Sequence, residues 1–173
     1  MGNILITGYP GVGKTTLIRQ LISELEAWNP IGFYTQEIRE SGVRKGFKWV
    51  DLGGRRGVLS HVELKSPYRV GRYGVDVEVF EAYLASLDLN TTETRMVILD
   101  EIGKMECLSP KFRFLLLEVL ESDRLLIATI ARKGTGFIET IKRRDDVELF
   151  HLRPENRDSL GQTILRHLTN VQP

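Results

Sequence analysis

A glycine-rich segment at residues 8–15, GYPGVGKT, restricts the fold of this chain more than any other feature. It follows an apolar run at 3–7, NILIT, which is typical of a buried strand. Residues 14–27 come next and predict a helix that ends before Pro30, because apolar residues recur on one helical face: Leu17, Ile18, Leu21, Ile22 and Leu25. A strand, a tight turn and a helix in direct succession indicate an α/β fold.

The spacing in this segment, G-x-x-x-x-G-K-T, is that of a loop that binds phosphate groups. Glycines let successive backbone N–H groups turn toward an anion, and the positive end of the following helix adds to the attraction. We expect Lys14 to contact the β- and γ-phosphates, Thr15 to bind Mg²⁺ and Thr16 to lie near the α-phosphate. The predicted nucleotide-binding residues of the loop are Gly8, Tyr9, Pro10, Gly11, Val12, Gly13, Lys14, Thr15 and Thr16.

A second motif begins at residue 95, where the predicted strand RMVIL ends in Asp100 and Glu101. Carboxylates at the C-terminal end of a parallel strand lie at the edge where such sheets bind ligands. We therefore expect Asp100 to hold Mg²⁺ through a water, and Glu101 to orient or deprotonate a water for in-line attack. Thr129, near the end of the next strand, either offers its hydroxyl to the γ-phosphate or the water, or packs within the sheet.

Strands and helices alternate through the second half of the chain. The predicted strands lie at 125–130 and 147–152, and the predicted helices at 76–87, 110–121, 137–144 and 154–169, the last with Pro154 in its first turn. This alternation indicates a mostly parallel sheet flanked by helices. The chain has no linker that would separate two domains, so we expect a single domain over residues 1–173.

A small basic insertion interrupts the alternation at about 33–76. It begins with a predicted β-hairpin over 33–51, whose turn is Glu40-Ser41-Gly42, and continues with residues 52–76, predicted to be irregular or short extended structure over the core. Residues 39–72 contain nine basic and three acidic side chains, whereas the whole chain has 24 basic and 23 acidic. This segment is either a solvated basic face or a surface that meets phosphate.

Composition excludes several classes of protein. With 42% hydrophobic and 27% charged residues, the chain does not resemble a disordered protein. Cys107 is the only cysteine, so no internal disulfide can form. The longest apolar run, at 125–131, is much shorter than the roughly 20 residues that span a bilayer, and the N-terminus lacks the pattern of a signal peptide. We expect a cytoplasmic monomer with no membrane partner.

Six segments resemble a known family: GYPGVGKTTL at 8–17, GFYTQEIRESGVRKGF at 32–47, RGVLS at 56–60, RVGRYGVD at 69–76, LDEIGKME at 99–106 and ENR at 155–157. Over nearly its whole length the chain is similar to the small P-loop nucleoside-triphosphatases, sometimes called cancer-related nucleoside-triphosphatases. The resemblance implies a RecA-like variant of the P-loop fold and slow, Mg²⁺-dependent hydrolysis of several nucleoside triphosphates. It also implies a second nucleotide-binding segment at Leu99, Asp100, Glu101, Ile102, Gly103, Lys104, Met105 and Glu106.

The leading hypothesis is therefore a Mg²⁺-dependent hydrolase of ATP, GTP, CTP and UTP. Loose base specificity is expected because no N-K-x-D sequence for guanine recognition occurs. The predicted catalytic residues of this hydrolase are Glu101, Lys14 and an arginine near the transition state. The candidates for that arginine are Arg39, Arg44, Arg56, Arg69 and Arg72 in the basic segment and Arg157 in the last predicted helix. Arg56, Arg69 and Arg157 rank first because they fall within the family segments, and structural ion pairing is the alternative role of each.

The sequence leaves two other functions open. One is a nucleotide or small-metabolite kinase, which would transfer phosphate to an acceptor and hydrolyse slowly without it. The other is a nucleoside-triphosphate-dependent module in which residues 39–72 bind nucleic acid or a protein. Glu101 disfavours the module, because a protein that only binds needs no carboxylate to activate water.

Overall fold

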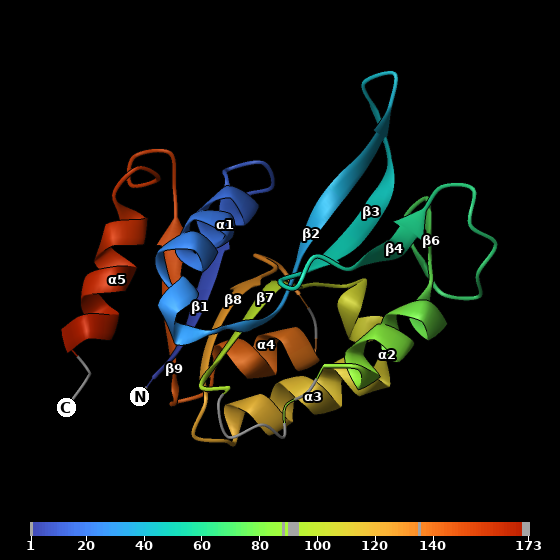
Figure 1. The fold of residues 1–173 in the computed structure, drawn as a ribbon. Coiled ribbons are helices and arrows are strands. Elements are labelled where there is room, and N and C mark those ends of the chain that lie inside the picture. The colour runs from blue at the N-terminus through green and yellow to red at the C-terminus, as the bar shows by residue number, and fades with distance from the viewer. Residues whose placement is uncertain (1, 88, 90–93, 135, 171–173) are drawn as a thin grey trace.

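The computed structural model describes residues 2–87, 89, 94–134 and 136–170, and its strands form one nine-stranded sheet covered by helices (Figure 1). The order across the sheet is β5-β6-β4-β3-β2-β7-β8-β1-β9. The strands are β1 Asn3–Gly8, β2 Ile31–Glu40, β3 Val43–Asp51, β4 Arg56–His61, β5 Arg69–Val70, β6 Tyr73–Val75, β7 Met96–Ile102, β8 Leu125–Ile130 and β9 Val147–Leu152. The helices are α1 Lys14–Glu24, α2 Val77–Ala85, α3 Pro110–Leu120, α4 Phe137–Lys142 and α5 Leu160–Asn170, with 3₁₀ turns η1 Glu26–Trp28 and η2 Glu106–Leu108.

The sheet is mixed, which corrects the prediction of a mostly parallel sheet. Neighbouring strands are parallel from β2 through β7, β8 and β1 to β9, as the strand–helix alternation predicted. On the other side of β2, strands β3, β4, β6 and β5 continue the sheet by antiparallel pairing. Short connections join these strands, and a short connection can link only antiparallel neighbours.

The predicted hairpin is confirmed, and its turn has a specific geometry. Strands β2 and β3 pair up to Glu40 and Val43, which leaves Ser41 and Gly42 as the two turn residues. Their φ angles are 47° and 79°, the positive values that a type I′ turn requires. The hairpin therefore continues the twist of its strands and rises away from the rest of the sheet (Figure 1).

Residues 52–76 are more regular than the sequence predicted. Strand β4 pairs with β3, and the short strands β5 and β6 complete the edge of the sheet. The buried side chains of Leu59 and Val75 join the main core. The sequence did not predict these strands because the segment is rich in glycine and arginine, and both are poor indicators of a strand.

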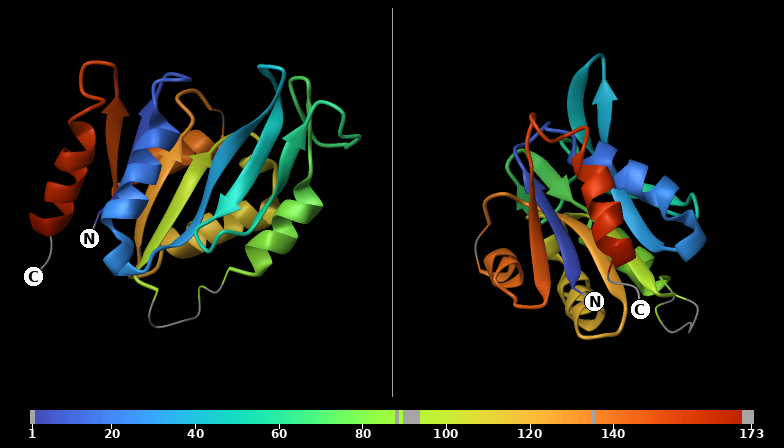
Figure 2. Two further views of the ribbon diagram at one scale, coloured as in Figure 1. Left: turned by 45° about the horizontal axis from the view of Figure 1, so that its top comes forward. Right: turned by 90° about the vertical axis from the view of Figure 1, so that its left-hand side faces the viewer.

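Two hydrophobic cores lie on opposite faces of the sheet (Figure 2). Alternate residues of β1 point to opposite sides, as in any strand. Ile4 and Ile6 pack with α1 and α5, whereas Leu5 belongs to the core that α2, α3 and α4 cover. No helix among the described residues is long and apolar enough to cross a membrane.

The last helix begins later than predicted. Residues 154–159 form turns, and α5 starts at Leu160, so Pro154 does not lie in its first turn. The side chain of Asn156 accepts a hydrogen bond from the backbone N–H of Arg153 at 2.8 Å and donates one to the carbonyl of His151 at 2.9 Å. These local bonds give the backbone an alternative to the helix.

The other predicted helices are confirmed with smaller changes at their ends. Helix α1 stops at Glu24, and η1 fills the interval before Pro30. Asp76 and Ser109 cap α2 and α3, since their side chains accept bonds from the N–H groups of Val79 and Phe112. Helix α4 ends at Lys142, two residues before the predicted boundary.

Candidate functional site

A cavity of about 940 Å³ lies where the C-terminal ends of the parallel strands meet. Strand β8 separates β1 from β7, so the segments that follow β1 and β7 both border this edge of the sheet. Cavities of about 300–1,000 Å³ are typical of small-molecule sites, and in open α/β sheets they occur at this edge. The two motifs that are far apart in the sequence therefore border one site.

The glycine-rich loop, residues 8–15, forms one wall of the cavity. Gly11 and Gly13 have backbone φ angles of 77° and 109°, which residues with a Cβ rarely adopt. Helix α1 begins directly after them at Lys14, and its first turn contains no acidic side chain. The N–H groups that begin a helix have no partner within it, so this end attracts an anion.

Asp100 is buried beside the loop and accepts two hydroxyl hydrogen bonds. Thr15 donates to its Oδ2 at 2.7 Å, and Thr129 donates to its Oδ1 at 2.5 Å. Thr129 thus neither offers its hydroxyl to the cavity nor merely packs in the sheet, since it holds the carboxylate. Burial raises the pKa of Asp100 above its usual value, and the bonds from Thr129 and Thr15 oppose the rise.

Glu101 connects the second motif to the loop through an ion pair. The ammonium of Lys14 lies 3.5 Å from Oε2 of Glu101 and also donates to the carbonyl of Gly8 at 3.4 Å. Burial raises the pKa of Glu101, Lys14 opposes this rise and Asp100 adds to it. The two carboxylates, the ammonium and the Thr15 hydroxyl therefore form one continuous group.

Glu106 is a third carboxyl group at the site. It is buried, and a Cβ built on Gly103 would lie 2.7 Å from its Oε2 and 3.0 Å from Oε1 of Glu101. A glycine at 103 therefore lets the backbone pass close to both carboxyl groups. Burial, followed by the charge of Glu101, raises the pKa of Glu106 to about 8.

Most of the predicted binding residues line the cavity. From the loop and the first turn of α1 these are Pro10, Gly11, Gly13, Lys14, Thr15 and Thr16. From the second segment they are Asp100, Glu101, Lys104, Met105 and Glu106. Gly8, Tyr9, Val12, Leu99, Ile102 and Gly103 do not line it; Leu99 and Ile102 are fully buried in the core, and Tyr9 is 61% exposed with Arg132 over its ring.

The structure does not bring Arg69 or Arg157 to the cavity. The guanidinium of Arg69 donates to the carbonyl of Arg72 at 2.9 Å. Arg157 is mostly exposed, and its Nε lies 3.6 Å from Asp158. Arg56 does not line the cavity either. Their catalytic roles stay predictions.

The sequence did not predict the wall that the hairpin region supplies, apart from Arg44, which was one of several candidate arginines. Besides Val70 and Gly71, this wall consists of Thr35, Gln36, Glu37, Arg44, Phe47 and Tyr73. Ala131 and Lys133, which follow β8, complete the lining. The segments GFYTQEIRESGVRKGF and RVGRYGVD contain most of these residues, so the signal was present, although their spacing gave no chemical reason to choose among them.

An anion-binding loop, a hydroxyl bonded to a carboxylate and a second carboxylate beside a lysine define a nucleotide-binding α/β enzyme. Comparison with known proteins specifies the family. The family model described as NTPase matches residues 3–165. The chain is 50% identical to "Nucleoside-triphosphatase THEP1" of Thermotoga petrophila over 163 residues, which cover 94% of this chain and 90% of that protein.

Two solved structures share the fold. The crystal structure of THEP1 from Aquifex aeolicus matches with a TM-score of 0.86 and 36% identity, over 96% of this chain and 98% of the other. The solution structure of a human cancer-related nucleoside triphosphatase matches with a TM-score of 0.82 and 35% identity, over 100% of both chains. The chain therefore belongs to the NTPase family.

Proposed function

We propose that the protein is a Mg²⁺-dependent nucleoside-triphosphate phosphohydrolase with loose base specificity, built as a single RecA-like P-loop domain. The observation that carries this proposal is the contact of Thr15 with Asp100 at 2.7 Å, beside the pair of Lys14 with Glu101 at 3.5 Å. These four side chains supply the cation, the metal ligands and the base that phosphate hydrolysis requires. The relatives are named nucleoside-triphosphatases, in agreement with this chemistry.

The loop and Lys14 would bind the phosphate chain. The positive φ angles of Gly11 and Gly13 shape the loop, and α1 adds the field of its N-terminal end. Lys14 is now shared between Glu101 and the carbonyl of Gly8. Both contacts of the Lys14 ammonium are long, so a phosphate group, which carries more negative charge than a carboxylate, would compete well for it.

The donor atoms at the site suit Mg²⁺. This ion prefers oxygen ligands and is usually held by one or two carboxylates together with substrate phosphates and water. Asp100 and Thr15 offer two such oxygens, and no cluster of three or more acidic, histidine or cysteine ligands occurs among the described residues. When Mg²⁺ is bound, Asp100 and Thr15 would hold it, and it would neutralise negative charge that develops on the phosphate groups.

Glu101 would act as the general base. A water attacks the terminal phosphorus, its proton passes to the carboxylate of Glu101, and the bond to the bridging oxygen breaks, which gives a diphosphate and phosphate. Glu101 directly follows Asp100 but is less buried, so one carboxylate holds the metal while the other can reach a water.

Phosphate release from ATP, GTP, CTP and UTP tests this function. We expect all four to be hydrolysed without an added acceptor, because the site recognises phosphates rather than a base, and we expect chelation of Mg²⁺ to abolish release. Lys14→Ala should weaken triphosphate binding. Release that requires an added acceptor would instead identify a kinase, and release that is independent of Mg²⁺ would contradict the proposal.

A further inference from the structure

Arg44 is the only arginine that lines the cavity among the described residues. It lies on β3, which β2, β7 and β8 separate from β1 and the glycine-rich loop. On the basis of the proposed hydrolysis, we propose that Arg44 contacts the terminal phosphate group and stabilises its charge in the transition state. Phosphoryl transfer spreads negative charge over the terminal oxygens, and an arginine can bind two of them with its planar donors.

The position of Arg44 follows from the order of the strands. Lys14 follows β1, Asp100 and Glu101 end β7, and Arg44 lies on β3, across β2 from β7. A terminal phosphate between Lys14 and the carboxylates therefore has the loop on one side and the hairpin on the other. Backbone N–H groups of the loop reach the first side only, so a cation from β3 serves oxygens that the loop leaves without a donor.

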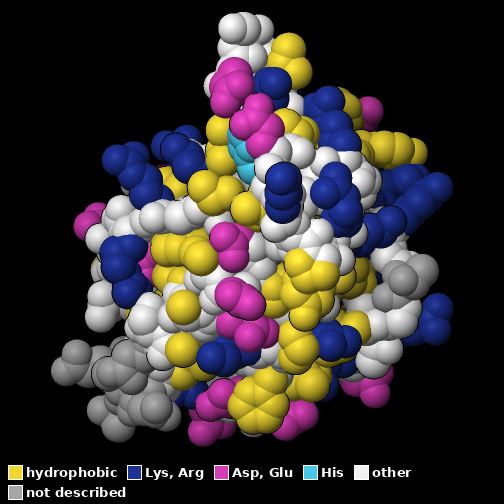
Figure 3. All heavy atoms as spheres, turned by 90° about the vertical axis from the view of Figure 1, so that its right-hand side faces the viewer, with side chains coloured by type: hydrophobic (Ala, Val, Ile, Leu, Met, Phe, Trp, Pro, Cys, Tyr) yellow, Lys and Arg dark blue, Asp and Glu magenta, His cyan; other side chains and the backbone are white. Residues whose placement is uncertain are grey.

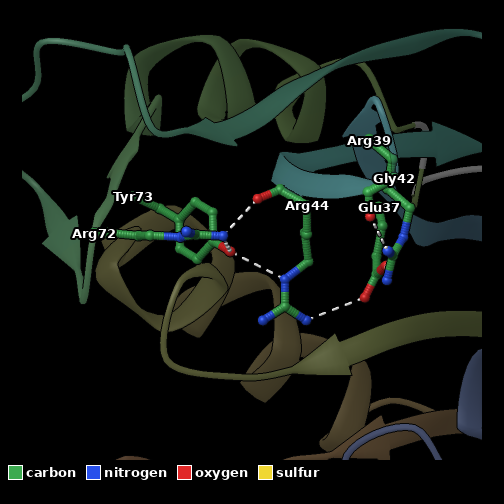
Figure 4. Close-up of polar contacts among 6 residues, drawn as sticks. All are labelled: Glu37, Arg39, Gly42, Arg44, Arg72 and Tyr73. Carbon is green, nitrogen blue, oxygen red and sulfur yellow. Dashed lines mark hydrogen bonds and ion pairs between the residues drawn. The ribbon is translucent and has the colours of Figure 1, made fainter.

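The side chain of Arg44 is held at its inner end (Figure 4). Its Nε donates to the hydroxyl of Tyr73 at 3.0 Å, and its guanidinium lies 5.2 Å from the ring centre of Phe47. Arg72 steadies this arrangement, because it donates to the backbone carbonyl of Arg44 at 2.6 Å and to the Tyr73 hydroxyl at 3.2 Å. Tyr73 is buried, so these bonds orient the guanidinium without using its outer nitrogens.

The outer end of Arg44 is held weakly by an exchangeable partner. Its Nη1 donates to Oε1 of Glu37 at 3.1 Å, and the two side chains are 44% and 36% exposed. Glu37 also pairs with Arg39, at 2.6 Å. If the guanidinium of Arg44 moves to a phosphate group, Glu37 still pairs with Arg39, so its carboxylate is not left without a partner. Solvent-exposed ion pairs contribute little, and a triphosphate is the stronger partner.

The charge of Glu37 fits this exchange. Partial burial raises the pKa of Glu37, but hydrogen bonds from Arg44 and Arg39 outweigh it and hold the pKa below its usual value. Glu37 is therefore ionised at neutral pH and keeps Arg44 near the cavity when no nucleotide is bound. The carboxylate serves as a resting position for the arginine.

Steady-state hydrolysis and binding by Arg44→Ala, Arg44→Lys and Lys45→Ala test this inference. Lys45 is the matched control, because it is the next residue on β3 and pairs with Glu40 instead. We expect Arg44→Ala to lower kcat by about 100-fold or more, with little change in the affinity for a non-hydrolysable triphosphate. Arg44→Lys should recover part of the rate, and Lys45→Ala should retain it.

A transition-state mimic supplies a second readout. Arg44→Ala should bind ADP with aluminium fluoride much more weakly than wild type but bind ADP alone equally well, which a loss of folding would not produce. A kcat of Arg44→Ala within about twofold of wild type, or an equal loss in Lys45→Ala, would overturn the inference. Hydrolysis by wild type and its loss in Glu101→Gln would then leave the proposed function intact.

Discussion

At the scale of single residues, hydrogen bonds from two threonine hydroxyls fix the orientation of the Asp100 carboxylate. Each carboxylate oxygen has its own hydroxyl donor, Thr15 on one side and Thr129 on the other. The second contact falls at an irregularity of the sheet: β7 and β8 pair Leu99 with Ala128 and then, after a shift of register, Ile102 with Ile130, and Asp100 and Thr129 lie between these two pairs. The sequence could place Thr129 near the site but could not reveal this bond, since it depends on register.

Glu106 predicts a measurable pH dependence of stability. Its pKa is about 8 in the folded protein because of burial and the nearby Glu101, against 4.5 for an ordinary glutamate. Between these values the folded state binds the proton more tightly than the unfolded state, so the contribution of Glu106 to stability falls as pH rises, by at most about 1.4 kcal/mol per pH unit. Above about pH 8 the contribution changes no further.

Denaturant unfolding of wild type and Glu106→Gln across this range checks the prediction. The variant cannot titrate at this position, so its free energy of unfolding should rise relative to that of wild type between about pH 5 and pH 8. Parallel curves for the two proteins would show that Glu106 does not hold its proton.

At the scale of elements, continuous segments were the easiest to predict. The loop at 8–15 and the strand end at Asp100 each contain their whole signal within a few neighbouring residues. The predicted start of α5 was wrong. Proline is favourable in the first turn of a helix, so Pro154 suggested a helix there. The competing hydrogen bonds of the Asn156 side chain depend on the three-dimensional path of the chain, which the sequence does not show. The strands at 56–61 and 73–75 were missed because pairing, rather than propensity, stabilises them.

The conformation of the glycine-rich loop gives a prediction at this scale. Gly13 has a φ angle of 109°, and nothing lies within 4 Å of a Cβ built on it, so Gly13→Ala strains the backbone without a clash. We expect a loss of stability of roughly 1–3 kcal/mol and weaker triphosphate binding, because the loop N–H groups move. Thermal unfolding and binding titrations measure the two effects.

Gly42 offers a matched control. It has a φ angle of 79° with equally open space around its Cβ, but it lies at the tip of the hairpin. Gly42→Ala should also lose stability and should keep normal triphosphate binding. Equal binding by both variants would mean that the conformation at Gly13 does not shape the phosphate site.

At the scale of the whole molecule, the uneven charge of the sequence has a structural explanation. Residues 39–72 form most of the antiparallel half of the sheet. On the face seen from this side, Lys and Arg side chains lie in separate groups, with acidic and apolar side chains between them (Figure 3). Several are paired locally, such as Arg55 with Asp51 at 2.9 Å and Arg39 with Glu37 at 2.6 Å.

The structure supports the first interpretation, a solvated basic face, for most of the basic segment, and contact with phosphate stays a proposal for Arg44. Most side chains of the segment are solvated or paired, whereas Arg44 lines the cavity. The sequence offered Arg44 as one of several candidate arginines but could not single it out, because the choice depends on how the antiparallel strands extend the sheet beyond β2. The parallel half, in contrast, was predictable from its alternating strands and helices.

In the proposed mechanism, Glu101 activates the attacking water in a site that binds triphosphate through other groups. The most direct test measures triphosphate affinity and phosphate release for Glu101→Gln beside wild type. We predict unchanged or tighter binding, since the amide keeps the shape and removes a negative charge, and a fall in turnover of about 100-fold or more. Turnover close to that of wild type would contradict the assignment of the base and, with it, the proposed mechanism.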